Sequence, residues 1–288
     1  VIADRKPRSG VVVSIRQSSL VNRQFLMPLS FETRPTLVAY VTCGDPDLET
    51  TLEIVLAAIE AGAGIIELGV PFSDPVADGP IIQRASERAL RQGATLEKIL
   101  KLASQIRRRS QAGLIIFSYL NPILKMGLKA FCDTAEEAGI DGALILDLPV
   151  EEGSDYLREM KARRLSTILL AAPTSTDQRL RQMAKVSTGF VYAVSRTGVT
   201  GSRRELPDDA RQLVTRIRKF TKLPVAVGFG ISLPAQFAAV GEYAEGAVVG
   251  SAIVQTIEQN PGKEPESVAQ FVKQLFGAGR QSSATAKS

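Results

Sequence analysis

Residues 64–80 have the sequence Gly-Ile-Ile-Glu-Leu-Gly-Val-Pro-Phe-Ser-Asp-Pro-Val-Ala-Asp-Gly-Pro, in which an apolar strand-like run acquires a carboxylate and passes into a proline-rich loop. Burying the carboxylate of Glu67 in such a strand is costly unless the group is paired or used. The loop then delivers another acid, Asp78. Because the chain contains no histidine, proton transfer falls to Asp, Glu, Tyr, Lys or Cys. Glu67 and Asp78 are the first candidates for it.

A β-branched run followed by an amphipathic helical stretch recurs eight times from residue 35 onward. Apolar residues are spaced by three and four in the helical stretches, for example in Leu48–Ala61 and Asp177–Val186. Eight such units in about 240 residues predict an α/β protein with a single-domain (β/α)8 TIM barrel over residues 31–275. A doubly wound open sheet is the alternative, but it usually has about five to seven strands. The strand-like runs are Leu37–Thr42, Gly64–Val70, Gly113–Tyr119, Gly142–Leu148, Ser166–Ala171, Gly189–Val194, Pro224–Gly228 and Gly246–Gly250.

The two ends of the chain differ in composition from this predicted barrel. Residues 1–30 are polar and basic, and we expect an N-terminal extension that is partly disordered; a transit segment is the alternative. Residues 276–288 predict a disordered C-terminal tail. The ends also carry the excess charge: of the net +5, residues 1–24 contribute five basic and one acidic residue and the tail two basic residues. The remainder is close to neutral, which argues against a nucleic-acid partner.

Cysteine and histidine usage excludes several classes of site. The two cysteines, Cys43 and Cys132, lie far apart, and no CxxC spacing is present, so we expect reduced thiols and no metal. The absence of histidine excludes Ser-His-Asp triads and histidine-based zinc sites. No apolar run approaches the roughly 18 residues of a membrane span. Reduced thiols suit a reducing compartment, and a cytoplasmic location is expected.

Polar residues, acids and glycines gather where the predicted strands end. In a barrel these carboxyl ends meet at one face, which is where barrel enzymes carry their active sites. The opposite ends are mostly plain Gly, Ala or Pro, and this asymmetry predicts an active face. Besides Glu67, the carboxyl-end residues include Thr42, Gly44, Asp45, Tyr119, Asn121, Asp147, Thr174, Ser195, Arg196, Gly228 and Gly250.

The ends of the last two predicted strands favour phosphate binding. They are Gly228-Phe229-Gly230 and Gly250-Ser251, at the position where barrels often bind phosphate beside a short helix. Glycines let the backbone approach an anion, and the first amides of a helix donate to it. We expect Ser251 to cap that helix; tight turns and an ordinary cap are the alternative. The Gly-rich residues 195–201 predict a lid, with a solvated loop as the alternative.

Six motifs together resemble one family, the α subunits of tryptophan synthase. They are ELGVPFSDPVADGP (67–80), YVTCGDPD (40–47), DLPVEE (147–152), SRTGVTG (195–201), GFGIS (228–232) and GSAIV (250–254), and they occur in order over residues 37–258. The resemblance implies a carbon–carbon lyase that cleaves indole-3-glycerol phosphate by a retro-aldol step to indole and glyceraldehyde 3-phosphate. It also implies a β-subunit partner, in an α2β2 complex, that uses the indole for L-tryptophan synthesis. Pyridoxal phosphate would belong to that partner, so no cofactor is expected in this chain.

The resemblance also implies roles for individual residues. Glu67 matches the general acid/base, and Asp78 the acid that contacts the indole N–H. From the residues alone, Glu67 as a paired structural acid, Asp78 as a turn residue, and Asp45 and Asp147 as loop caps remain open. The resemblance places Asp147 near the subunit contact. Substrate-binding positions are Tyr40, Tyr119, Tyr192, Thr200, Gly201 and Phe229, and phosphate-binding positions are Gly201, Gly230, Gly250 and Ser251.

Three other functions stay open at this point. The leading interpretation is half of a bienzyme complex, and the first alternative is a lyase that works alone and releases free indole. A different phosphate-binding barrel, such as a sugar-phosphate isomerase or epimerase, would lack a reason for the Glu67 and Asp78 pair. A non-catalytic allosteric barrel would not need either acid.

Overall fold

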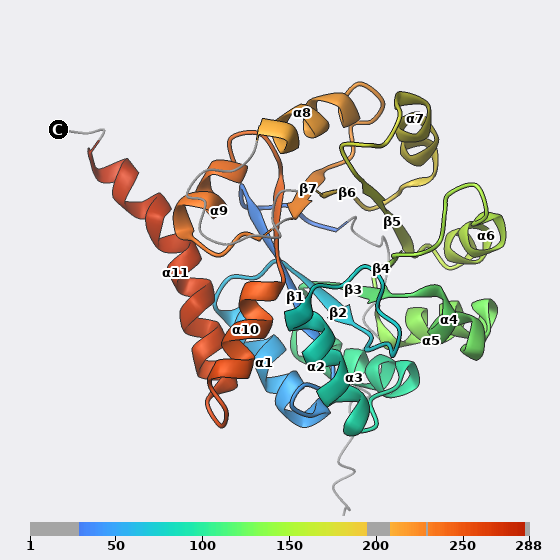
Figure 1. Cartoon of the computed structure of the whole chain (residues 1–288), viewed down its shortest axis with the longest axis horizontal. Helices are drawn as coiled ribbons and strands as arrows, with labels where there is room; N and C mark the ends of the chain where they lie inside the picture. Colours follow the sequence, from blue (N-terminus) through green and yellow to red (C-terminus); the bar gives the residue numbers. More distant parts are fainter. Residues whose placement is uncertain (1–28, 195–207, 229, 286–288) are drawn as a thin grey trace, which may run out of the picture.

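The structure is a closed barrel of eight parallel strands in sequential order, β1 to β8 (Figure 1). The computed structural model describes residues 29–194, 208–228 and 230–285. The ring closes where β8 pairs with β1, with Thr36 opposite Gly246. The predicted (β/α)8 barrel is therefore confirmed. The strands are β1 Thr36–Thr42, β2 Ile65–Gly69, β3 Gly113–Ser118, β4 Gly142–Ile145, β5 Ser166–Ala171, β6 Val191–Val194, β7 Val225–Gly228 and β8 Gly246–Val249.

Helices surround the ring, and their bounds follow local signals. Asp47, Thr95 and Thr176 each accept a hydrogen bond from a backbone N–H in the first turn of the helix that follows. Gly139 ends one helix in the left-handed conformation, at φ +81°. The helices are α1 Leu48–Glu60, α2 Pro80–Arg91, α3 Leu96–Arg109, α4 Leu120–Met126, α5 Leu128–Ala138, α6 Ser154–Ala162, α7 Asp177–Val186, α8 Asp208–Ile217, α9 Pro234–Val240, α10 Ser251–Gln259 and α11 Glu264–Thr285.

The floor of the barrel is apolar and contains one residue from each strand or, for β6, the residue directly before it. These residues are Val38, Ile65, Ile115, Leu144, Ile168, Phe190, Ala226 and Val248, and Leu29 joins them. Phe31 lies against the edge of Phe190, with 5.6 Å between the ring centroids. The barrel therefore includes Leu29, two residues before the predicted start of the domain. The rest of the expected N-terminal extension, residues 1–28, lies outside the described residues.

Helix α11 continues to Thr285, into the stretch 276–288 for which a disordered tail was expected. Phe276 explains the start of this continuation. Its ring packs edge-on against Phe237 of α9, with 5.0 Å between the centroids. A helix that still buries an aromatic side chain gains free energy from staying helical. Across the described part of the chain, no helix combines the length and apolar character needed to cross a membrane.

Candidate active site

The candidate site is the layer of side chains directly above the barrel floor. Side chains two positions apart in a strand point to the same face. Glu67 therefore follows Ile65 into the barrel interior, and Tyr40 follows Val38 on the neighbouring strand. Tyr40 and Glu67 are paired in register between β1 and β2. A polar layer thus lies on an apolar one inside the ring.

Glu67 is a buried carboxyl group without a partner. Its side chain is fully buried, and neither oxygen accepts or donates a hydrogen bond among the described residues. Burial raises the pKa of Glu67 to about 8. The group therefore holds a proton at neutral pH. Pairing with Lys or Arg, which is the structural alternative for this acid, is not found in the described parts of the chain, and a buried acid left unpaired marks a functional candidate.

Asp78 is held by an aromatic side chain from a different loop. The hydroxyl of Tyr119 donates to Asp78 Oδ2 at 3.2 Å and accepts the Ala77 N–H at 3.0 Å. The Tyr119 ring lies 5.0 Å from that of Phe72, centroid to centroid. Burial raises the pKa of Asp78, and the hydrogen bond from Tyr119 partly opposes this. Asp78 is therefore more than a turn residue, because its carboxylate joins the loop to the end of β3.

Two further tyrosines stand beside the acids. Burial raises the pKa of Tyr40 well above its usual range, and the charge of Asp78, with that of Glu67 once it has ionised, adds to this. Burial likewise raises the pKa of Tyr192, with a contribution from Glu67. Both phenols are therefore neutral and close to the acids. Tyr40 also packs edge-on against Phe117, at 5.1 Å between centroids. Tyr40, Tyr192 and Phe117 thus form an aromatic wall beside the carboxyl groups.

Two glycines make room for this wall. A Cβ on Gly69 would collide with the hydroxyl end of Tyr40, and one on Gly228 would collide with that of Tyr192. The sequence motifs contain both glycines, but the expectation for Gly228 was a phosphate turn. In the structure, a side chain at Gly228 would push Tyr192 out of its place.

The ends of β7 and β8 differ in one detail from the prediction. Gly230 has a φ of +48°. Gly250, and not Ser251, is the residue that caps α10, and no side chain of a described residue bonds the free amides of its first turn. Ser251 is already the first helical residue. A Cβ on Gly250 would lie 3.4 Å from the Cβ of Tyr40, so the start of the helix adjoins the aromatic wall.

Some of the predicted site residues are not described by the structure, and the structure adds two residues that the sequence analysis did not predict. Thr200, Gly201 and Phe229 lie outside the described residues, as do the other residues of the expected lid. Phe72 and Phe117 were missed, although Phe72 lies inside the ELGVPFSDP motif and Phe117 two positions after a buried isoleucine. That period of two could have identified Phe117.

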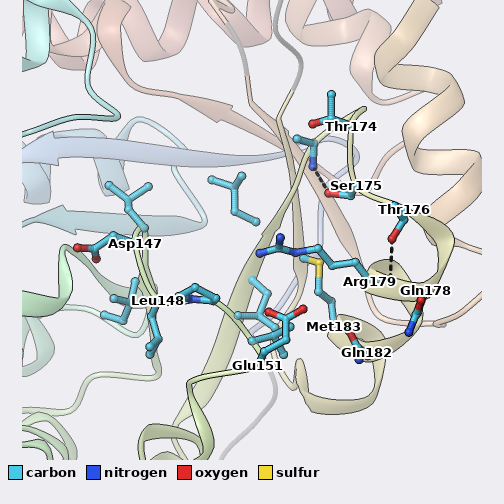
Figure 2. Close-up of a pocket in the computed structure, with 17 residues that line it drawn as sticks. Asp147, Leu148, Glu151, Thr174, Ser175, Thr176, Gln178, Arg179, Gln182 and Met183 are labelled. Carbon is cyan, nitrogen blue, oxygen red and sulfur yellow. Dashed lines mark hydrogen bonds between the residues drawn. The ribbon is translucent and has the colours of Figure 1, made fainter.

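A hollow of about 730 Å³ lies between the segments that follow β4 and β5 (Figure 2). Arg179 extends into it from α7 toward the loop that carries Leu148. Asp147 borders the hollow, and its Oδ1 accepts the Leu120 N–H at 2.7 Å. Asp147 therefore bonds the first helical N–H of α4, an element distant in the sequence. No group of three or more His, Cys, Asp or Glu side chains suited to a metal ion occurs among the residues that the structure covers.

The model of one protein family, described as the tryptophan synthase alpha chain, matches residues 27–283. The chain belongs to the tryptophan synthase alpha chain family. Among curated family members, the tryptophan synthase alpha chain of Solibacter usitatus is 49% identical over 255 residues, which cover 87% of this chain and 96% of the relative. That of Geotalea daltonii is 48% identical over 236 residues, covering 82% and 89%.

Solved structures of the tryptophan synthase α subunit share the fold. A mutant α subunit from Pyrococcus furiosus superposes with a TM-score of 0.80 at 37% identity, covering 87% of this chain and all of that one. A structure described as the tryptophan synthase a2b2 complex of the same organism gives a TM-score of 0.81 at 38% identity, with the same coverage. Identity above a third over this length supports the family assignment as well as the fold.

Proposed function

We propose that this chain is a carbon–carbon lyase that cleaves indole-3-glycerol phosphate to indole and glyceraldehyde 3-phosphate. One observation carries the proposal: Glu67 is a fully buried, unpartnered acid with a raised pKa, set against an aromatic wall. Family membership supplies the substrate class. The site supplies a proton donor, a second acid and flat apolar surfaces of the kind that an indole ring needs.

The two acids divide the chemistry. Indole is a poor carbon leaving group, so its ring carbon must gain a proton before the carbon–carbon bond can break. Protonated Glu67 donates that proton. Asp78 accepts a hydrogen bond from the indole N–H and stabilises the positive charge on the ring. The glycerol hydroxyl then loses its proton to the Glu67 carboxylate as the bond electrons return to the indole ring, releasing indole and the aldehyde.

The substrate would lie between the aromatic wall and the start of α10. Tyr40, Tyr119 and Tyr192 border the ring, and Phe229 and Thr200 are proposed to complete its surroundings. The phosphate group would accept hydrogen bonds from the backbone around Gly201, Gly230, Gly250 and Ser251. Among the described residues, no side chain caps the amides at the start of α10, and this supports the placement because a helix N-terminus favours an anion.

We further propose that the chain works with a tryptophan synthase β subunit in an α2β2 complex and passes indole to it. The Pyrococcus furiosus relative, which is described as an a2b2 complex, supports this partner. Pyridoxal phosphate would be held by the β subunit, and the chemistry assigned to Glu67 and Asp78 requires no cofactor. Both cysteines are buried and unpaired, which supports the cytoplasm as the location.

The deciding experiment measures indole release from indole-3-glycerol phosphate by the purified chain, with and without a tryptophan synthase β chain. We expect slow release by the chain alone and a strong rise when the β chain is added. Equal and fast release in both conditions would instead favour a lyase that works alone. No release in either condition would refute the substrate assignment.

A further inference from the structure

A chain of ion pairs links helices α2 and α10, which lie side by side (Figure 1). Glu258 of α10 accepts two hydrogen bonds from Arg84 of α2, at 2.9 and 2.7 Å. It accepts a third from Arg88, one turn further along α2, at 2.8 Å. Arg88 also grips both oxygens of Asp45, at 2.7 and 2.8 Å. One guanidinium group thus joins two carboxylates from different elements.

The linkage is partly buried. Asp45 is 2% exposed, and the side chains of Arg88 and Glu258 are 32% and 26% exposed. Hydrogen bonds from Arg84 and then Arg88 hold the pKa of Glu258 at about 2. Glu258 is therefore ionised at any pH at which the enzyme would act. An arginine that donates two hydrogen bonds to one carboxylate fixes the orientation of the two side chains as well as their separation. A lysine ammonium group fixes only the separation.

The linked elements are those that carry the candidate site. Helix α2 begins at Pro80, two residues after Asp78. Helix α10 begins at Ser251, beside the proposed phosphate position. Asp45 follows β1, the strand of Tyr40. Beneath the ion pairs, Tyr40 packs in one apolar cluster with Ala85 of α2 and Val254 of α10.

We propose that Glu258 and Arg88 are positioning residues that fix α2, and with it the carboxylate of Asp78, relative to the phosphate-binding start of α10. The proposal rests on the proposed function. Helix α10 packs against both β1 and α11, whereas α2 has β1 as its other main neighbour and follows a loop in which Val76 is 88% exposed. Loss of the linkage would therefore displace Asp78 more than it displaces α10.

The central test is Glu258→Gln, which weakens the link between the helices and leaves Arg88 paired with the buried Asp45. We expect kcat for indole release to fall about tenfold, because small displacements of a catalytic group are costly. The dissociation constant for inorganic phosphate should change by less than about twofold, since the start of α10 stays in place. Arg88→Lys should give an intermediate kcat, because one ammonium group cannot fork onto two carboxylates.

A matched control is Arg109→Gln. It breaks a pair between helices α3 and α1, with Glu53 at 2.9 Å, that lies away from the site and is half exposed. This variant should keep both kcat and phosphate affinity. An unchanged kcat in Glu258→Gln would overturn the proposal. So would a parallel loss of kcat, phosphate affinity and unfolding temperature, which indicates general loosening.

Amide hydrogen exchange tests the proposal without activity. In Glu258→Gln, amides of residues 71–79 should exchange faster, while those of the first turn of α10 should not. Equal exchange rates in loop 71–79 of wild type and variant would refute the positioning function even in an active enzyme. If the wild-type protein releases no indole, but residues 71–79 still exchange faster in Glu258→Gln than in the wild type, the proposed reaction is refuted and the linkage is supported.

Discussion

The hydroxyl of Tyr119 bonds the carboxylate of Asp78, 41 positions earlier in the chain, while accepting the backbone N–H of Ala77. A residue at the end of β3 thereby fixes an acid that the β2–α2 loop alone would leave free to move. The bond also favours the ionised form of Asp78, whereas burial favours the protonated form. Tyr119 is therefore expected to act on both the position and the charge of this acid.

Tyr119→Phe removes this bond and keeps the ring. We expect kcat/KM to fall roughly tenfold, because a hydrogen bond to a charged group contributes about 1.5–3 kcal/mol. Without the donor the pKa of Asp78 rises, so the acid limb of the pH–rate profile should move to higher pH. Tyr156→Phe is the control, since it removes a buried hydroxyl bonded to Ala143 outside the site. An acid limb that does not move would separate Tyr119 from the ionisation of Asp78.

Glu67→Gln should reduce turnover by at least about 10² to 10⁴, which is the usual contribution of a general acid or base. The variant keeps the shape of the side chain but cannot donate the carboxylic proton. In the wild-type enzyme, activity should decline as pH rises through about 8, because Glu67 then loses the proton it must donate. Steady-state indole release across pH 6–9 measures both effects. Retained turnover in the variant would remove Glu67 from the mechanism.

The same substitution predicts a change in stability with a defined sign. The pKa of Glu67 is raised from 4.5 to about 8 on folding, so the folded state binds the proton more tightly than the unfolded state. Below pH 4.5, Glu67 therefore does not lower the free energy of unfolding of the wild type. As pH rises from 4.5 toward 8, that free energy decreases. Each pH unit in that window costs about 1.4 kcal/mol relative to Glu67→Gln. Urea unfolding of both proteins at pH 5, 6.5 and 8 should show the difference in unfolding free energy growing by several kcal/mol. A pH-independent difference would mean that the folded-state pKa is ordinary.

The sequence was sufficient to predict the barrel, because the patterns that indicate strands and helices are local. Periods of two and of about 3.6 residues place each strand and helix to within a few residues, and the register then puts Glu67 above Ile65. Contacts between distant residues carry no such pattern. Asp45 was open as a loop cap, yet it pairs with Arg88, 43 residues away. Phe276 packs against Phe237, a contact that composition does not predict. The cap of α10 shifted by one residue, to Gly250, which is the usual uncertainty of helix boundaries.

Asp78→Asn should lower kcat by two orders of magnitude or more, as loss of a charge that stabilises the transition state does. The amide can still accept the Tyr119 hydrogen bond, so the loop should stay in place and the unfolding free energy should change by less than about 1 kcal/mol. Asp74→Asn, in the same loop and exposed, is the matched control and should retain activity. A near-normal rate for Asp78→Asn would leave Asp78 with a structural function only.

Gly228→Ala should lower activity through Tyr192. The added Cβ would collide with the tyrosine hydroxyl, so the ring must move into the space proposed for the indole. Overpacking of this kind costs about 1–3 kcal/mol of stability, and KM should rise as the ring site narrows. Gly153→Ala, whose added Cβ meets nothing nearer than 3.5 Å, should change neither quantity. Removing the obstruction with Gly228→Ala combined with Tyr192→Ala should recover part of the lost affinity if steric displacement is the cause. If the double variant binds substrate no better than Gly228→Ala alone, the glycine acts through the backbone at the end of β7 and not by making room for Tyr192.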